Sequence, residues 1–168
     1  MNPDVVIVAR EGAVDAAWPG CRVIAVLDGG EVRGDVIRLR NEAPLGFTRS
    51  ANRGLLVRKR DVLLLDGGAR PSLDEMTMAL QASDRIAAVC AAGCMLFRHI
   101  VLNMIGALDP AFTHRDDAFA DWVLRAQRLG FRHEGRIGEQ RDVALLKSRH
   151  PHYPAQLETS APSAPGLR

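Results

Sequence analysis

Apolar residues recur along the chain in short runs that predict buried strands. Val5–Ala9, Arg22–Leu27 and Val62–Leu65 are rich in Val, Leu and Ile, Ile86–Cys90 is similar, and Asp35–Leu39 is weaker. Short continuous apolar runs, without alternation of polar residues, are typical of strands that are covered on both faces. The pattern therefore predicts a sheet whose strands are mostly parallel.

Helical patterns separate these strands. One helix is predicted over Arg49–Arg60 with Thr48 as its N-cap, and a second over Ser72–Ala82, which begins with an S-x-x-E capping box. A third, Asp116–Leu129, has apolar residues at helical spacing and ends before Gly130. Strands that alternate with helices predict an α/β fold with helices on both faces of the sheet.

The first crossover is short. A dozen residues separate Ala9 from Arg22, and they include Gly12, Pro19 and Gly20. A full strand–helix–strand crossover needs at least about a dozen residues. We therefore expect either one or two turns of helix or a plain loop, so that this half of the fold is trimmed.

Composition narrows the class of protein. The 168 residues are 47% hydrophobic and 25% charged, which suits one domain, here predicted over 1–147 with a Pro/Ala/Ser-rich tail over 148–168. The net charge of +2 suits a small anionic ligand and is too weak to indicate nucleic acid.

Cys90 and Cys94 do not form a C-x-x-C pair, so we expect buried free thiols. With no signal peptide or transmembrane segment in the pattern, we expect a cytoplasmic protein.

Two carboxylates follow predicted strands directly. Asp66 ends the run VLLLD and is followed by Gly67 and Gly68, and Asp28 ends AVLD before two more glycines. Ligands of open α/β sheets bind at the carboxyl ends of the strands. An ordinary Asp-Gly turn is the alternative at both places.

Three longer stretches carry a resemblance to a known family. They are NEAPLGFTRSANRGL (41–55), VLLLDGGARP (62–71) and AAGCMLFRHIVLNMIGALDPAF (91–112), followed by DWVLR (121–125). Together they resemble the family 2 glycosyltransferases, over roughly residues 4–137. The resemblance implies a GT-A-like (Rossmann-like) α/β fold.

The resemblance also implies a set of donor-binding residues. Asp28 would contact the nucleoside, Asp66 a divalent metal or the ribose, and Gly93 would lie under the donor sugar, while Asn52 and Arg53 would lie beside the nucleotide. The family has a second acid two residues after the first, where this chain has glycine. Mg²⁺ or Mn²⁺ would therefore bind weakly or not at all.

The family's catalytic acidic pair is displaced in this chain. Ala118 and Phe119 occupy the matching positions and cannot accept a proton, but Asp116 and Asp117 come just before them. Either could be the base that deprotonates the acceptor. The alternative is that both are ordinary helix-start acids. His150 and His152 lie where some relatives place a metal or phosphate ligand, and we expect no such role for them.

The implied activity is transfer of a hexose from a nucleotide-diphospho-sugar to a hydroxyl of a saccharide, lipid or protein, with inversion. The alternative is a non-catalytic module that binds a nucleotide-sugar or a protein partner. The missing second acid, the displaced pair and the trimmed crossover favour the alternative. The retained Gly54, Gly93 and Gly106 favour an intact ligand geometry. A homo-oligomer is compatible with either.

Overall fold

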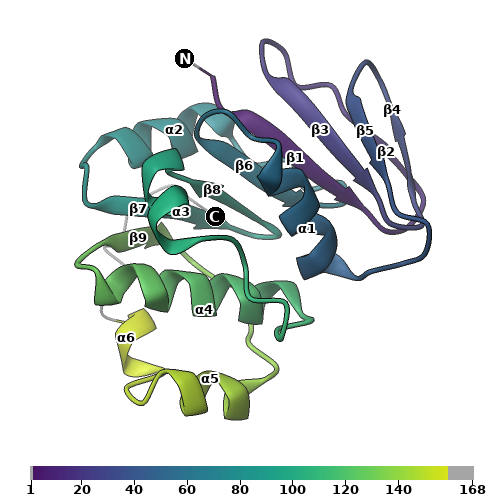
Figure 1. The fold of residues 1–168 in the computed structure, drawn as a ribbon. Helices are drawn as coiled ribbons and strands as arrows, with labels where there is room; N and C mark the ends of the chain where they lie inside the picture. The colour runs from purple at the N-terminus through teal and green to yellow at the C-terminus, as the bar shows by residue number, and fades with distance from the viewer. Residues whose placement is uncertain (1, 159–168) are drawn as a thin grey trace.

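The computed structural model describes residues 2–158, which form a seven-stranded sheet with helices on both faces (Figure 1). The strand order is β5-β3-β1-β6-β8-β7-β9, and β8 is the antiparallel member of this sheet. The predicted α/β architecture is therefore confirmed. The strands are β1 Asp4–Ala9, β2 Ala13–Asp15, β3 Arg22–Leu27, β4 Glu31–Arg33, β5 Ile37–Arg40, β6 Val62–Asp66, β7 Ile86–Ala91, β8 Cys94–Phe97 and β9 Arg132–Gly135.

The helices divide between the two faces of the sheet. The apolar sides of α1, α3 and α4 share one core, and that of α2 belongs to the other. The helices are α1 Phe47–Leu56, α2 Leu73–Gln81, α3 His99–Ile105, α4 Arg115–Arg128, α5 Val143–Arg149 and α6 Ala155–Glu158.

Strand β1 lies inside the sheet, between β3 and β6, and every one of its residues is buried. It pairs in parallel with β3 and β6, so that Ile7 lies between Ala25 and Leu65. Helix α1 packs closely on β1, since a Cβ at Gly54 would come within 2.4 Å of Val6 Cγ1. The retained glycine of this motif therefore serves helix–sheet packing.

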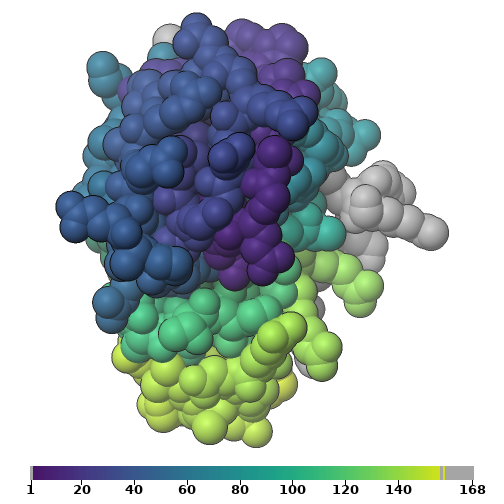
Figure 2. All heavy atoms as spheres, turned by 90° about the vertical axis from the view of Figure 1, so that its right-hand side faces the viewer, coloured from purple at the N-terminus to yellow at the C-terminus, as the bar shows by residue number. Residues whose placement is uncertain are grey.

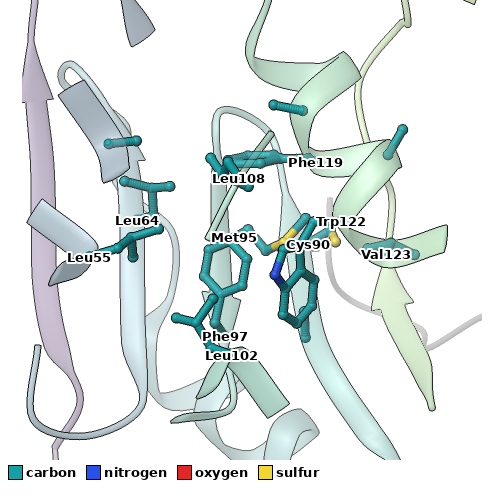
Figure 3. Close-up of a cluster of buried hydrophobic side chains, with 14 of the residues drawn as sticks. Leu55, Leu64, Cys90, Met95, Phe97, Leu102, Leu108, Phe119, Trp122 and Val123 are labelled. Atoms are coloured by element: carbon teal, nitrogen blue, oxygen red, sulfur yellow. The ribbon is translucent and has the colours of Figure 1, made fainter. Parts of the chain in front are cut away.

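Aromatic rings fill the core between the sheet and α4 (Figure 3). Trp122 is fully buried, and its ring meets Phe97 edge-on with centroids 4.8 Å apart. Its indole Nε1 donates to Gly106 O at 2.9 Å, which satisfies the polar atom of this side chain. Phe119 also meets Phe97 edge-on.

Helix α1 begins and ends differently from the prediction. Gly46, not Thr48, is the N-cap, and the Thr48 hydroxyl instead donates to Phe112 O at 2.6 Å. The helix ends at Leu56, so 57–60 lie outside it. The second helix does begin at Ser72, whose hydroxyl accepts the Glu75 N–H.

No helix forms in the first crossover. Residues 13–15 and 31–33 instead form a two-stranded parallel ribbon, β2 with β4. The loop alternative is thus the one observed, with a short strand inside it.

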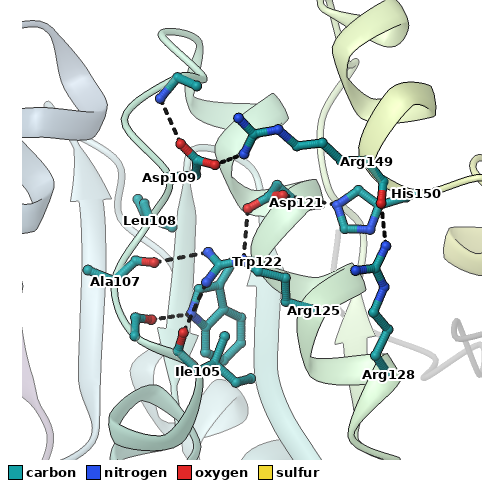
Figure 4. A network of polar contacts seen from close by, with 12 residues as sticks. Ile105, Ala107, Leu108, Asp109, Asp121, Trp122, Arg125, Arg128, Arg149 and His150 are labelled. Carbon is teal, nitrogen blue, oxygen red and sulfur yellow. Dashed lines mark hydrogen bonds and ion pairs between the residues drawn. The ribbon is translucent and has the colours of Figure 1, made fainter.

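The ordered body continues past the predicted boundary at 147, which falls inside α5. His150 is buried and its Nε2 lies 2.9 Å from Asp121 Oδ1, so this residue belongs to the fold (Figure 4). Figure 2 shows the yellow-green C-terminal segment as the lower end of the molecule, below the green segment. The remainder of the predicted tail, 159–168, lies outside the described residues.

Candidate functional site

The carboxyl ends of the central strands bring charged residues together. Arg10 follows β1, Asp28 follows β3 and Asp66 ends β6. Because these three strands are parallel neighbours, their carboxyl ends meet at one edge of the sheet. From the other side Arg115, the first residue of α4, reaches the same edge.

Asp66 lies between two arginines. Arg10 makes a bidentate contact, Nε to Oδ1 at 3.1 Å and Nη2 to Oδ2 at 2.6 Å. Arg115 Nη1 donates to Oδ2 at 3.2 Å. The Asp66 side chain is 11% exposed, whereas that of Arg10 is 45% exposed. Arg10 is therefore the member of this ion-paired group that faces solvent at the strand ends.

Arg115 also holds the acid that follows it. Its Nε and Nη2 donate to the two oxygens of Asp116 at 2.8 and 3.0 Å. These hydrogen bonds, opposed by desolvation, raise the pKa of the Arg115 guanidinium above its ordinary value. The chain Arg10–Asp66–Arg115–Asp116 is thus a continuous row of alternating charge, which we call the arginine–carboxylate row.

The donor set of this edge does not fit a divalent cation. Mg²⁺ and Mn²⁺ need several oxygen ligands, and both Asp66 oxygens are hydrogen-bonded to guanidinium groups. Among residues 2–158, no group of three His, Cys, Asp or Glu side chains is placed to hold a metal. Gly68, at the position of the family's second acid, supplies no ligand.

Gly93 lies beside the arginine–carboxylate row. It turns the β7–β8 hairpin with φ of 76°, and its carbonyl accepts the Asp66 N–H at 3.0 Å. A Cβ there would lie 3.4 Å from Ala69 Cβ and 3.5 Å from Arg115 Nη1. These are ordinary contact distances, so it is the left-handed backbone that favours glycine at this position.

Asp28 is committed to contacts within the protein. Its oxygens accept Asn41 Nδ2 at 2.6 Å and the N–H groups of Leu45 and Gly46 at 2.7 and 3.0 Å. Asp28 is 4% exposed. It therefore places a negative charge at the start of α1, where the helix dipole favours one, and stabilises the 41–46 loop.

Asn52 and Arg53 also bond to the protein itself. The Asn52 side chain donates to Leu108 O at 2.7 Å and accepts the Leu108 N–H at 3.0 Å. Arg53 donates to Arg40 O at 3.0 Å and to the Asn41 side chain. Asn52 therefore fixes the loop before α4, and Arg53 fixes the end of β5. Their predicted contacts with a nucleotide remain a prediction.

Asp117 is more deeply enclosed than Asp116. Its oxygens accept the N–H groups of Arg141 at 2.7 Å and Asp142 at 3.1 Å, and its side chain is 2% exposed. The same segment covers Asp116, because a Cβ at Gly138 would lie 2.3 Å from Asp116 Oδ2. An acceptor could reach either carboxylate only if segment 136–142 moved away.

The D-x-x-x-R motif forms a clamp between helices (Figure 4). Arg125 Nε donates to Asp121 Oδ2 at 2.9 Å, and its two Nη atoms donate to the carbonyls of Ile105 and Ala107. These carbonyls lie at the end of α3, so the pair joins α4 to α3. His150 completes the arrangement on the other side of Asp121, which is a packing role.

Two residues of this edge were not predicted as site residues. Arg10 directly follows a buried strand, as Asp66 does, so its position at a strand end was the available signal. Arg115 directly precedes the acidic pair.

Cys90 and Cys94 are free thiols, as the sequence predicted. Burial raises the pKa of Cys90 strongly and that of Cys94 to about 11, so both thiols stay protonated at neutral pH.

No protein-family model and no curated protein matches this sequence. Among solved structures, it is similar to the mannosyltransferase PcManGT from Pyrobaculum calidifontis, solved in complex with GDP-Man and Mn²⁺. The TM-score is 0.54 at 11% identity, covering 79% of this chain and 54% of that chain. The chain therefore spans about half the length of the mannosyltransferase and shares the α/β fold of the part that it matches.

Proposed function

We propose that the protein binds a nucleoside-diphosphate sugar at the carboxyl edge of its sheet and transfers the sugar to a hydroxyl with inversion, as a small relative of the family 2 glycosyltransferases. The observation that carries the proposal is the arginine–carboxylate row at the strand ends. A guanidinium pair can receive a diphosphate through charge-assisted, bidentate hydrogen bonds.

The likeness to a mannosyltransferase solved with GDP-Man supports a nucleotide-sugar as the ligand. Arg10 is the more accessible cation of the row, and Arg115 lies beside Gly93. In this proposal Arg10 and Arg115 neutralise the charge that develops on the departing diphosphate. Asp66 orients both guanidinium groups.

Asp116 is the better candidate for the base. Its carboxylate joins the row through Arg115, whereas Asp117 is bonded to backbone N–H groups. For transfer, segment 136–142 has to uncover Asp116. The same segment covers Asp116 and Asp117, and this enclosure favours the second candidate function. That candidate is a non-catalytic module that binds a nucleotide-sugar without transferring the sugar.

Calorimetry with UDP, GDP and TDP at millimolar concentration tests the binding step, since even weak specific binding gives heat there. We expect one of the three to bind, and Arg10→Gln and Arg115→Gln each to weaken it about 10- to 100-fold, the loss of a charge-assisted hydrogen bond. Arg85→Gln is the matched control, because this exposed arginine precedes β7 at the opposite edge of the sheet.

No heat with any of the three nucleotides, or equal loss from Arg85→Gln, would contradict the proposal. Release of free nucleoside diphosphate from the matching nucleotide-sugar then separates the two candidate functions. Release that depends on Asp116 supports the transferase. Binding without release, over a series of donors and acceptors, supports the non-catalytic module.

A further inference from the structure

Four large apolar side chains are exposed on the face that α1 and α3 cover. Leu56 and Val57, at the end of α1, are 77% and 39% exposed. Ile100 and Met104, on α3, are 63% and 60% exposed. The latter two are one helical turn apart and so share one side of α3. We call these four residues the apolar patch.

A bridging arginine shows that the two halves of the apolar patch are neighbours. Arg58 Nη1 donates to Leu55 O at 2.5 Å, in α1, and Nη2 donates to Asn103 Oδ1 at 2.5 Å, in α3. Figure 1 shows both helices on the same side of the sheet, in agreement with their common core. The patch is therefore one surface rather than two isolated exposures.

Basic residues border the apolar patch. Arg58, Lys59 and Arg60 follow α1 directly, and the last two line a cavity of about 310 Å³ together with His99. Two acids lie nearby: Asp61 accepts the His99 N–H at 2.7 Å, and the buried Asp4 pairs with Arg60 at 3.4 Å and with Arg22 at 2.6 Å. The border of the patch therefore carries net positive charge.

We propose that the apolar patch and its basic border bind the surface of an anionic lipid bilayer. Exposed apolar side chains insert at the boundary between headgroups and acyl chains, while neighbouring Lys and Arg attract anionic headgroups. The charge argues for lipid over a second copy of the chain. A two-fold contact through this patch would bring residues 58–60 of both copies together, which like charge opposes.

The patch lies at the end of the sheet opposite to the candidate site. The Lys59 N–H bonds to Asp4, the first residue of β1, whereas Arg10 follows the last. The bilayer would therefore contact the amino edge of the strands and leave the carboxyl edge open to water. Variants in the patch should leave nucleotide binding unchanged, so the two proposals can fail separately.

Co-sedimentation with lipid vesicles tests the proposal. We expect binding to vesicles of phosphatidylcholine mixed with phosphatidylglycerol, weakened by salt, and much less binding to phosphatidylcholine alone. Leu56→Gln and Ile100→Gln should each lower the partition coefficient about five- to tenfold, since each removes one inserted apolar side chain. Lys59→Gln should lower it about fivefold.

Matched controls come from elsewhere on the surface. Met78 is 71% exposed on α2, over the opposite face of the sheet, and Lys147 is exposed on α5. Met78→Gln and Lys147→Gln should leave vesicle binding unchanged. Equal binding to neutral vesicles, no binding to anionic ones, or equal losses in these controls would overturn the proposal. So would a dimer in solution that Leu56→Gln and Ile100→Gln dissociate.

Discussion

The substitution Asp117→Asn tests whether the Asp117 carboxylate anchors segment 136–142, which covers the candidate site. The carboxylate accepts N–H groups from Arg141 and Asp142 and is almost fully enclosed. In the amide, one oxygen becomes an NH₂ group that cannot accept, so one of the two partly buried N–H groups loses its acceptor. A hydrogen bond to a charged group contributes ~1.5–3 kcal/mol, and an unsatisfied buried donor costs ~1–3 kcal/mol. We expect the free energy of unfolding to fall by about 3–5 kcal/mol.

Urea denaturation measures this loss. With a slope of about 2 kcal/mol per molar urea, the midpoint should fall by about 1.5–2.5 M. Asp74→Asn is the matched control, because Asp74 is an exposed acid in the first turn of α2. Its loss should stay within about 1 kcal/mol.

A similar small loss in Asp117→Asn and Asp74→Asn would refute the anchoring role. If Asp117→Asn abolished sugar transfer without moving the urea midpoint or the nucleotide affinity, the carboxylate would act as the base and not as an anchor.

Three further predictions concern the packing of Trp122, the pH dependence of stability, and Gly68, where the resemblance places a second acid. Trp122→Ala should cost about 3–5 kcal/mol in urea denaturation, because the ring is fully buried, and a loss below about 1 kcal/mol would contradict its packing role. Burial lowers the pKa of His133 from 6.5 to about 4, so below about pH 6.5 the unfolded chain takes up a proton that the folded chain excludes. Stability should fall as pH drops through that window, by about 2 kcal/mol more in the unmodified protein than in His133→Gln between about pH 7.5 and pH 5, and parallel pH curves would rule this out. Mn²⁺ alone should not raise the melting temperature, whereas Gly68→Asp, whose Cβ meets no atom within 4 Å, should gain Mn²⁺-dependent nucleotide binding that Gly68→Asn lacks. Tight Mn²⁺ binding by the unmodified protein would show that the metal site lies elsewhere.

The central strands were predictable because burial on both faces leaves a direct trace in the sequence. β1, β3, β6 and β7 are nearly continuous Val, Leu, Ile and Ala, and each is an isolated run of five or six residues, a length typical of a strand and too short for most helices. The sequence of β9 shows no such apolar run. Its residues, RHEG, are polar, and they form a strand because pairing with β7 imposes it.

The stretch from Cys94 to Ile105 forms two elements, β8 and α3, that its sequence pattern does not separate. It is mostly apolar, with Arg98, His99 and Asn103 as its polar residues, and no Gly or Pro divides β8 from α3. The direction of β8 is set by the left-handed turn at Gly93. A short apolar run of this kind does not reveal whether it is strand or helix.

For the candidate site, the sequence places Asp28 and Asp66 at strand ends, as the structure has them. It does not reveal their partners. The ion pairs that define the arginine–carboxylate row join Asp66 to residues 56 and 49 positions away in the chain. Such contacts depend on how the strands and α4 come together, which local patterns do not encode.

The antiparallel β7–β8 hairpin has a consequence for the order of folding. Val89 and Leu96 pair within one hairpin, so little chain entropy is lost when they meet. Ile7 and Leu65 pair across most of the N-terminal half, and contacts so distant in sequence form slowly. We therefore expect the hairpin to form early and the β1–β6 junction late. Since Arg10 and Asp66 lie at that junction, a partly folded chain would have its hairpin in place and still lack the diphosphate site that we propose.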